Sequence, residues 1–363
     1  MIFNRDTPYN DLPDLPPATD FDTSELWRAT TKANRLLAEL KGYCQVLPDP
    51  TLLINTIILQ ESKDSSAIEN IVTTQDELYR AVVSNEDRSV SHATKEVLWY
   101  REALYQGFDQ LEKRGVITTN ALIGIMQQLR QTDAGIRKNT GTKLMNPAAN
   151  RVIYTPPEGE LIIRNKLASL EKFINDNDAS DLDPLVKMAL IHYQFEAIHP
   201  FGDGNGRTGR ILNVLYLVAQ GLLTLPILYL SSYIISHKSE YYRHLREVTE
   251  EGKWQNWVLF MVNAVAETSE LTLEKIKGIF RLQAQSLEQI RALLPNTNAR
   301  DISDIIFSYP YVKIKILETK GIARRQTAST YLQKLSEAGI LQPMKVGKEI
   351  YYINHKLMKL MTE

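Results

Sequence analysis

The chain has 363 residues, 44% of them apolar, and a formal net charge of −1 at pH 7. This length allows two or three domains with buried cores, and the balanced charge gives no sign of a nucleic-acid-binding surface over the whole chain. One cysteine, Cys44, excludes an internal disulfide framework and suits a reducing cytosol, and no uninterrupted apolar run reaches membrane-spanning length. We therefore expect a cytoplasmic protein with no membrane partner.

The N-terminal third is predicted to be an extended arm followed by helices. Residues 1–20 carry four prolines, which indicates an arm that crosses the surface. Helical patterns begin near Thr23 and continue to about residue 266. Within them, Ser65 and Glu69 are four positions apart, which places both side chains on one face of a helix. The fold class expected is mainly α.

A short hairpin is predicted over residues 143–157. Turn-forming residues occupy 146–150, and β-branched residues follow in the second arm. This hairpin is the one interruption expected in the helical part of the chain.

Two helices are predicted to flank a glycine-rich loop. Residues 185–198 lack turn residues and repeat apolar side chains at three- and four-residue spacing, so they predict a buried helix that ends before Pro200. A second helix is expected to start at Arg210 and to be closed by Gly221. Between them, residues 199–210 read His-Pro-Phe-Gly-Asp-Gly-Asn-Gly-Arg-Thr-Gly-Arg.

This loop holds the groups that phosphate chemistry needs. His199 can accept a proton, and Asp203 can hold a divalent metal. Glycines at the start of a helix expose free N–H groups, which with Arg207 and Arg210 suit phosphate oxygens. The pattern G-x-G-x-x-G over 204–209 would indicate a dinucleotide site only after a strand, and here it follows a helix. A P-loop sequence is absent.

The C-terminal segment, 300–363, resembles a winged helix-turn-helix. Helices are predicted near 302–307, 313–318 and 324–335, and two strands are predicted within 340–353 with a turn at Gly347. The segment has eleven Lys and Arg against six Asp and Glu, a local charge of +5, which suits DNA phosphates. Such modules also mediate contacts with other proteins or dimerisation, so binding of a protein partner or formation of a homodimer is an alternative to DNA binding.

The twelve residues 199–210 resemble the signature of Fic domain proteins, His-Pro-Phe-x-[Asp/Glu]-Gly-Asn-Gly-Arg-x-x-Arg, at every fixed position. The resemblance implies a mostly helical core and Mg²⁺-dependent transfer of AMP from ATP to a Ser, Thr or Tyr hydroxyl of a protein, including the chain itself. It implies that His199 is the catalytic base and that Asp203 holds Mg²⁺. The nucleotide-binding residues implied in the signature are Gly204, Asn205, Gly206, Arg207, Thr208, Gly209 and Arg210. Residues 240–245 resemble the stretch that walls the adenine pocket, which adds Tyr241 and Tyr242.

Two further segments resemble parts of the same family. Residues Ser65, Glu69 and Asn70 fit the inhibitory motif [Ser/Thr]-x-x-x-Glu-[Gly/Asn], which implies that Glu69 pairs with Arg210 in the place of the γ-phosphate. The hairpin at 143–157 resembles the Fic flap, which holds the target protein by strand addition.

The expected organisation has four parts: an N-terminal helical region with the inhibitory helix over 1–110, a Fic core over 111–266, a linker helix over 267–299 and the winged helix-turn-helix over 300–363. Three alternatives remain open. The enzyme removes AMP, with Glu69 placing a water; it transfers another group, such as phosphocholine or UMP; or the chain is a DNA-binding regulator whose core only senses nucleotide.

Overall fold

The computed structural model describes residues 3–362 apart from 46–50, 84–89, 147–149, 177–180 and 347–348. Helices dominate this part of the chain, as expected, and its sheets are small and antiparallel. The helices are α1 (Ser24–Gln45), α2 (Thr51–Ile68), α3 (Gln75–Val83), α4 (His92–Arg114), α5 (Thr119–Arg130), α6 (Glu160–Asn175), α7 (Pro184–Ile198), α8 (Asn205–Ala219), α9 (Leu230–Ser236), α10 (Lys238–Glu251), α11 (Trp254–Leu293), α12 (Ala299–Ser308), α13 (Ile314–Thr319), α14 (Arg325–Glu337) and α15 (His355–Thr362). The strands are β1 (Leu144–Asn146), β2 (Arg151–Tyr154), β3 (Tyr311–Val312), β4 (Gln342–Val346) and β5 (Glu349–Ile353).

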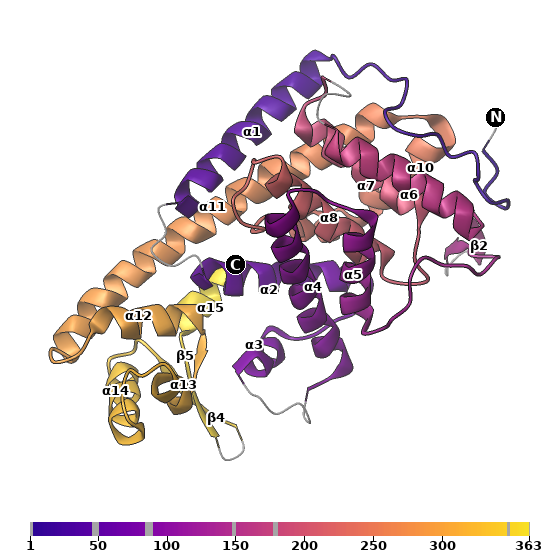
Figure 1. Ribbon diagram of the computed structural model, residues 1–363. Coiled ribbons are helices and arrows are strands. Elements are labelled where there is room, and N and C mark those ends of the chain that lie inside the picture. Colours follow the sequence, from indigo (N-terminus) through magenta and orange to yellow (C-terminus); the bar gives the residue numbers. More distant parts are fainter. Residues whose placement is uncertain are drawn as a thin grey trace.

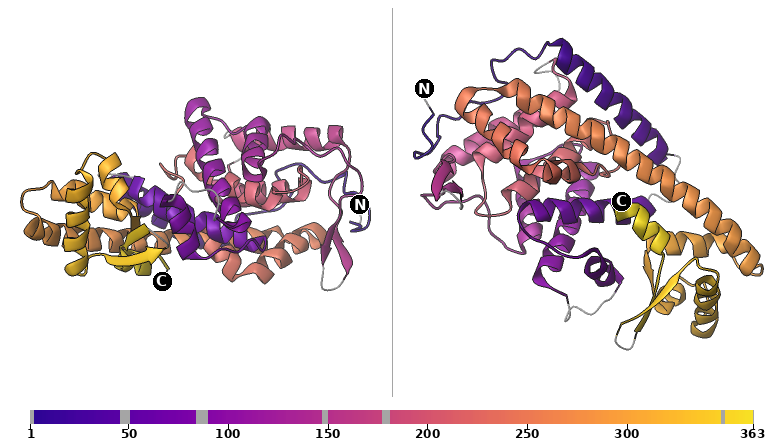
Figure 2. Two further views of the ribbon diagram at one scale, coloured as in Figure 1. Left: turned by 90° about the horizontal axis from the view of Figure 1, so that it is seen from below. Right: turned by 180° about the vertical axis from the view of Figure 1, so that it is seen from behind.

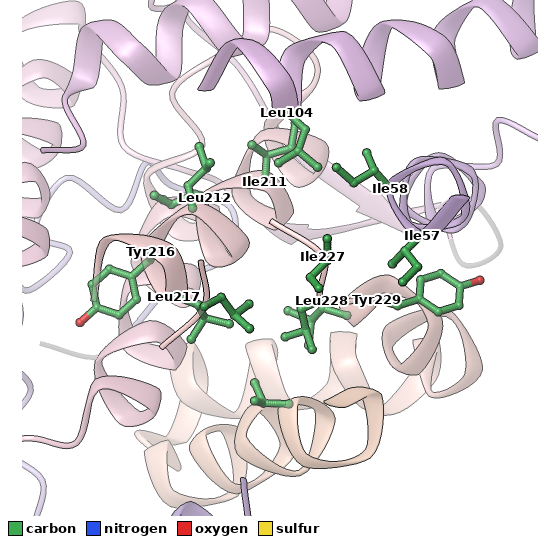
Figure 3. Packing of buried hydrophobic residues seen from close by; sticks show 14 of the residues in the cluster. Ile57, Ile58, Leu104, Ile211, Leu212, Tyr216, Leu217, Ile227, Leu228 and Tyr229 are labelled. Atoms are coloured by element: carbon green, nitrogen blue, oxygen red, sulfur yellow. The ribbon is translucent and has the colours of Figure 1, made fainter. Parts of the chain in front are cut away.

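Helices α7 and α8 form the centre of the molecule. Nearly every side chain of α7 is buried, because its apolar residues lie on all sides and neighbouring helices cover each side. Helix α8 packs against α7 and also contacts α4 and α5. Figure 3 shows apolar side chains of α8, among them Ile211 and Leu217, in one cluster with Leu104 of α4 and Ile58 of α2. The loop between α7 and α8 is therefore held by two buried helices.

The longest helix, α11, lies side by side with α1 along one flank of the molecule (Figures 1 and 2). Our sequence prediction started this helix at residue 267. The structure starts it at Trp254 and continues it without a break to Leu293, because the intervening residues include no proline and only one glycine, Gly278. The expected junction at 266/267 thus falls inside one continuous helix.

The start of α8 also differs from the prediction. We expected Arg210, and the helix begins five residues earlier at Asn205. Glycine and asparagine have low helix propensity, which made these residues look like loop. Gly204 supplies the turn before the helix with a φ of 84°, a conformation that favours glycine.

The hairpin at 143–157 is present as β1 and β2, which pair antiparallel. Its turn, 147–149, lies outside the described residues. The N-terminal arm, which has turns but no helix or strand before Ser24, runs beside it, and the backbone N–H of Tyr9 donates to the carbonyl of Thr155 at 3.0 Å. The ring of Phe3 stacks on Tyr154 with centroids 5.9 Å apart. The arm therefore covers the end of the hairpin that follows β2.

The C-terminal segment has the order helix, strand, helix, helix, strand, strand, helix, with the sheet arranged β3–β5–β4. The three predicted helices and two predicted strands occur within a few residues of their expected limits. The short strand β3 and the last helix, α15, were not predicted, because two to eight residues carry little periodic signal. Figure 2 shows this segment at one end of the elongated molecule and the hairpin at the other. Across the described residues, the helices are too short or too polar to cross a bilayer.

Candidate active site

His199 lies at the end of α7 in a left-handed conformation, with a φ of 49°. This backbone conformation is strained for a residue other than glycine and is concentrated at functional sites. The guanidinium of Arg137 holds it there, because its Nε donates to the carbonyl of His199 at 2.8 Å. Burial and the Arg137 charge lower the pKa of His199 to about 4, so the imidazole is unprotonated near neutral pH and can accept a proton.

Asn205 closes the loop between the two central helices. Its side-chain oxygen accepts from the backbone N–H of Phe201 at 2.8 Å, and its side-chain nitrogen donates to the carbonyl of Phe201 at 2.8 Å. This pair of bonds fixes the start of α8, where backbone N–H groups have no partner inside the helix. The first turn of α8 is thus shaped to receive an anion.

Arg210 is 1% exposed and is held by the predicted inhibitory segment. Its Nε donates to Oγ of Ser65 at 2.8 Å, and its Nη2 donates to the carbonyl of Ser65 at 3.0 Å. Nη2 also donates to Oε1 of Glu69 at 2.9 Å. Burial opposes ionisation of Glu69, yet the Arg210 charge lowers the pKa of this carboxyl below its ordinary value. A charged pair therefore forms where the resemblance implied it.

Glu69 lies one residue beyond α2, in the turn that ends the helix, rather than inside the helix as expected. Asn70 makes the turn with a φ of 62°. The Glu69 carboxylate also lies directly against Gly206, where a β-carbon would collide with its Oε1. The carboxylate thus covers both Arg210 and the first turn of α8, two sites that would bind phosphate oxygens.

Arg207 and Asp203 are linked through two residues that our sequence analysis did not single out. Nη1 of Arg207 lies 2.9 Å from Oε2 of Glu96, and Nη1 of Arg130 lies 3.0 Å from the same oxygen. Nη2 of Arg130 in turn lies 3.0 Å from Oδ2 of Asp203. Four side chains of alternating charge therefore run from the buried Arg207 to the exposed Asp203.

The fit of this site to Mg²⁺ depends on one carboxylate. Among the residues that the structure describes, His, Cys, Asp and Glu form no group of three that could hold a metal. Mg²⁺ in nucleotide sites commonly keeps several waters and takes one or two carboxylates plus the substrate phosphates. The side chain of Asp203 is 62% exposed, and its Oδ1 is fixed by the backbone N–H of Gly204 at 2.6 Å. These features fit a carboxylate that binds a metal brought in with a nucleotide.

The two tyrosines assigned to the adenine pocket occupy different environments. Tyr241 is 1% exposed, and its hydroxyl pairs with Nε2 of His192 at 2.8 Å. Tyr242 is 45% exposed and packs edge-on against Tyr241, with ring centroids 5.1 Å apart. Of the two, only Tyr242 offers exposed ring surface.

Two residues of the signature that were assigned to nucleotide binding face the protein interior. Thr208 is fully buried, and Gly209 packs against Glu196.

Three stretches of the chain match known families. Residues 27–109 match the Fic/DOC family N-terminal domain, and residues 110–217 match the Fic/DOC family domain itself. This chain belongs to the Fic/DOC family. Residues 282–357 match the C-terminal domain described as "Protein adenylyltransferase SoFic-like".

Curated relatives of this Fic protein carry the name protein adenylyltransferase. One from Caenorhabditis briggsae is 29% identical over 150 residues, covering 41% of this chain and 26% of that protein. One from Drosophila virilis is 33% identical over 121 residues, covering 33% of this chain and 23% of that protein. The chain thus spans about a quarter of the length of these relatives.

Solved structures share the fold. A Fic family protein from Desulfovibrio desulfuricans superposes with a TM-score of 0.59 at 19% identity, covering 93% of this chain and 98% of that one. Fic-1 from Caenorhabditis elegans superposes with a TM-score of 0.52 at 20% identity, covering 70% of this chain and 74% of that one. At this level of identity, the comparison shows the Fic fold.

The residues that the sequence analysis missed are charged groups held far from the signature in the chain. Each of them contacts a residue of the signature that lies 62 to 111 positions away in the chain; the three are Glu96, Arg130 and Arg137. Each lies in an ordinary stretch of sequence, and nothing local marks it. The burial of Glu96 on the side of α4 that faces α8 becomes visible only in the folded chain.

Proposed function

We propose that this Fic protein transfers AMP from ATP to a hydroxyl group of a protein, its own chain included, and that Glu69 keeps this activity low. One observation carries the proposal: the Glu69 carboxylate lies on Arg210 and on the first turn of α8, inside a complete Fic signature. A carboxylate bound where a phosphate would bind competes with that phosphate.

The chemistry follows from the site. His199 accepts the proton of the attacking hydroxyl while the hydroxyl oxygen bonds to the α-phosphorus of ATP. The bond from that phosphorus to the bridging oxygen breaks, and pyrophosphate leaves. Arg207, Arg210 and the backbone N–H groups of α8 stabilise the charge on the departing phosphates. Mg²⁺ bound at Asp203 would supply further charge neutralisation.

The β1–β2 hairpin is the proposed docking place for the target protein. Within the described sheet, β1 pairs only with β2, so the outer edge of β1 has unpaired backbone groups. A target segment that adds to this edge is held by backbone bonds whatever its sequence. Arg137 connects the hairpin to the base, because its guanidinium donates to the carbonyls of Pro157 and His199.

The test uses ATP labelled at the α- or γ-phosphate. Transfer of AMP labels the protein only from α-labelled ATP, whereas transfer of the terminal phosphate labels it only from γ-labelled ATP. The proposal expects α-label on wild type and more on Glu69→Gly. Label from the γ-position, or from neither, contradicts it.

We also propose DNA binding by the C-terminal segment, on one specific observation. Arg324, Arg325 and Lys334 are exposed on or beside α14, which is the helix that a winged helix-turn-helix inserts into the major groove. A gel-shift titration tests this proposal separately from the transfer reaction.

A further inference from the structure

The phosphate site contains a row of four charged side chains that the Fic signature does not account for. Glu96 lies on α4 and Arg130 ends α5, both outside residues 199–210. The row runs Arg207, Glu96, Arg130, Asp203, and each neighbouring pair is joined by an ion pair of 2.9–3.0 Å. Nδ1 of His92, which is largely exposed, also lies 3.1 Å from Glu96.

Each member of the row restrains another. Arg207 is 2% exposed, so its orientation depends on protein partners, and Glu96 is the partner that the structure gives it. The stem of Arg130 packs against Gly204, where a β-carbon would lie 3.3 Å from Cγ of Arg130. The head of Arg130 reaches Asp203, the carboxylate that fits Mg²⁺. Arg130 and a metal would therefore compete for one carboxylate.

We propose that Glu96 and Arg130 are positioning residues of the phosphate site: Glu96 orients Arg207 and draws Arg130 toward itself, and Arg130 competes with Mg²⁺ for Asp203. The inference rests on the proposed nucleotide site. The balance between these contacts sets the Mg²⁺ concentration that the site needs, because Glu96 weakens the ion pair between Arg130 and Asp203.

Two variants should shift the Mg²⁺ requirement in opposite directions. Arg130→Ala removes the competing cation while the N–H of Gly204 still orients Asp203, so less Mg²⁺ is needed. Glu96→Gln frees Arg130 to pair fully with Asp203, so more Mg²⁺ is needed, and Arg207 loses its charged partner. We expect shifts of several-fold in each direction.

The measurement is calorimetric titration with ADP at a series of Mg²⁺ concentrations, which needs no turnover. ADP lacks the γ-phosphate that Arg210 would bind, and all titrations use a Glu69→Gly background, because the Glu69 carboxylate also covers the first turn of α8. Glu102→Gln is the matched control, because Glu102 lies on the same helix, is exposed and pairs with its neighbour Arg101. Thermal unfolding confirms that each variant is folded, and Arg130→Ala keeps the test valid if Glu96→Gln fails to fold.

The quantity compared is the Mg²⁺ concentration at which the gain in ADP affinity is half complete. It should fall in Arg130→Ala, rise in Glu96→Gln and stay unchanged in Glu102→Gln. Shifts in the same direction, or no shift in either variant, would overturn the inference. If the Glu69→Gly parent does not bind ADP at all, the proposed function fails first.

A second inference concerns the C-terminal segment, which contacts both elements that flank Glu69. Helix α12 packs on α2, the helix before Glu69, and β3 packs on α3, the helix after it. The hydroxyl of Tyr311 donates to Asp76 of α3, and its ring stacks on Tyr79 with centroids 5.9 Å apart and planes 8° apart. The Tyr79 hydroxyl accepts from Gln60 of α2 at 3.4 Å.

We infer that the C-terminal segment holds α2 and α3 in the position that keeps Glu69 on Arg210. The inference depends on the proposed inhibition by Glu69. Leu59 of α2 and Leu78 of α3 belong to one buried cluster with Tyr311 and Tyr351 of this segment. Displacing the segment would therefore loosen the turn between the two helices, and Glu69 with it.

The test removes the Tyr311–Asp76 contact from each side. Tyr311→Ala and Asp76→Ala should each raise self-labelling by a few-fold, less than Glu69→Gly does, because the Arg210 pair is weakened and not removed. In a Glu69→Gly background neither substitution should raise self-labelling further, because the Glu69 carboxylate through which both act is absent. Tyr331→Ala, on α14 of the same segment, is the control for loss of a ring.

Asp76→Ala leaves the C-terminal segment intact, so it keeps the test valid if Tyr311→Ala unfolds that segment. The inference fails if folded Tyr311→Ala and Asp76→Ala label at the wild-type level, or if they still raise labelling in the Glu69→Gly background. A Glu69→Gly variant without increased labelling refutes the proposed inhibition itself.

Discussion

Removing the Glu69 carboxylate should raise self-labelling about tenfold. In the structure, Glu69 makes one charge-assisted hydrogen bond to Arg210, and its side chain is 37% exposed. Such bonds contribute about 1.5–3 kcal/mol, and solvent screening at this exposure favours the lower end. About 1.4 kcal/mol corresponds to a factor of ten in rate or occupancy. Glu69→Gly should therefore raise binding of the γ-phosphate at Arg210, and with it self-labelling, by roughly that factor.

The assay is incorporation of α-labelled ATP into the purified chain, compared between wild type and Glu69→Gly at equal protein concentration. Glu69→Asp should give an intermediate increase, because the shorter side chain reaches Arg210 poorly. Glu337→Gly is the control, since Glu337 is an exposed glutamate at the end of a helix away from the site. Labelling that stays the same or falls in Glu69→Gly would refute the reasoning, and Glu69 would then be a surface charge or would place a water for AMP removal.

His199→Ala should abolish transfer while nucleotide affinity stays within a few-fold by calorimetry, because the imidazole acts on the incoming hydroxyl; transfer at the unaltered rate would disprove its role as base. Asp203→Ala should lose transfer and Mg²⁺ dependence together, whereas activity that persists in excess chelator would remove Asp203 from the metal role. Because the pKa of His199 is lowered to about 4, transfer by Glu69→Gly should be independent of pH from about 8 to about 5 and should fall only near 4; an acid limb centred near 6.5 would contradict the burial of this base. DNA affinity of the C-terminal segment should fall steeply with salt in a gel-shift titration, and Arg324→Ala with Arg325→Ala should flatten the slope by about one or two units; absence of binding at low salt would leave this segment as a protein contact.

The helical fold and the Fic signature were predictable because their information is local. Residues 199–210 are contiguous, and the pattern of apolar residues before and after them specifies two buried helices. The start of α8 was predicted wrongly because helix propensity disfavours Gly206 and Gly209, whereas in the fold Asn205 stabilises the turn through Phe201.

The supporting charges could not be predicted, because their partners lie far away in the chain. Glu96 meets Arg207 across 111 residues, and nothing in the sequence around it separates a buried charge from a solvated one. The same holds for Arg137, whose guanidinium contacts three backbone carbonyls around the base and the hairpin. The Glu69–Arg210 pair was an exception, since a known motif supplied the link that spacing alone does not.

The most direct test of the central claim is the intact mass of the Glu69→Gly chain after incubation with ATP and Mg²⁺, alongside the Glu69→Gly, His199→Ala double variant. The account predicts a gain of one or more AMP groups in the first chain and no gain in the second. A gain of phosphate instead of AMP, no gain at all, or an equal gain in the double variant would contradict it.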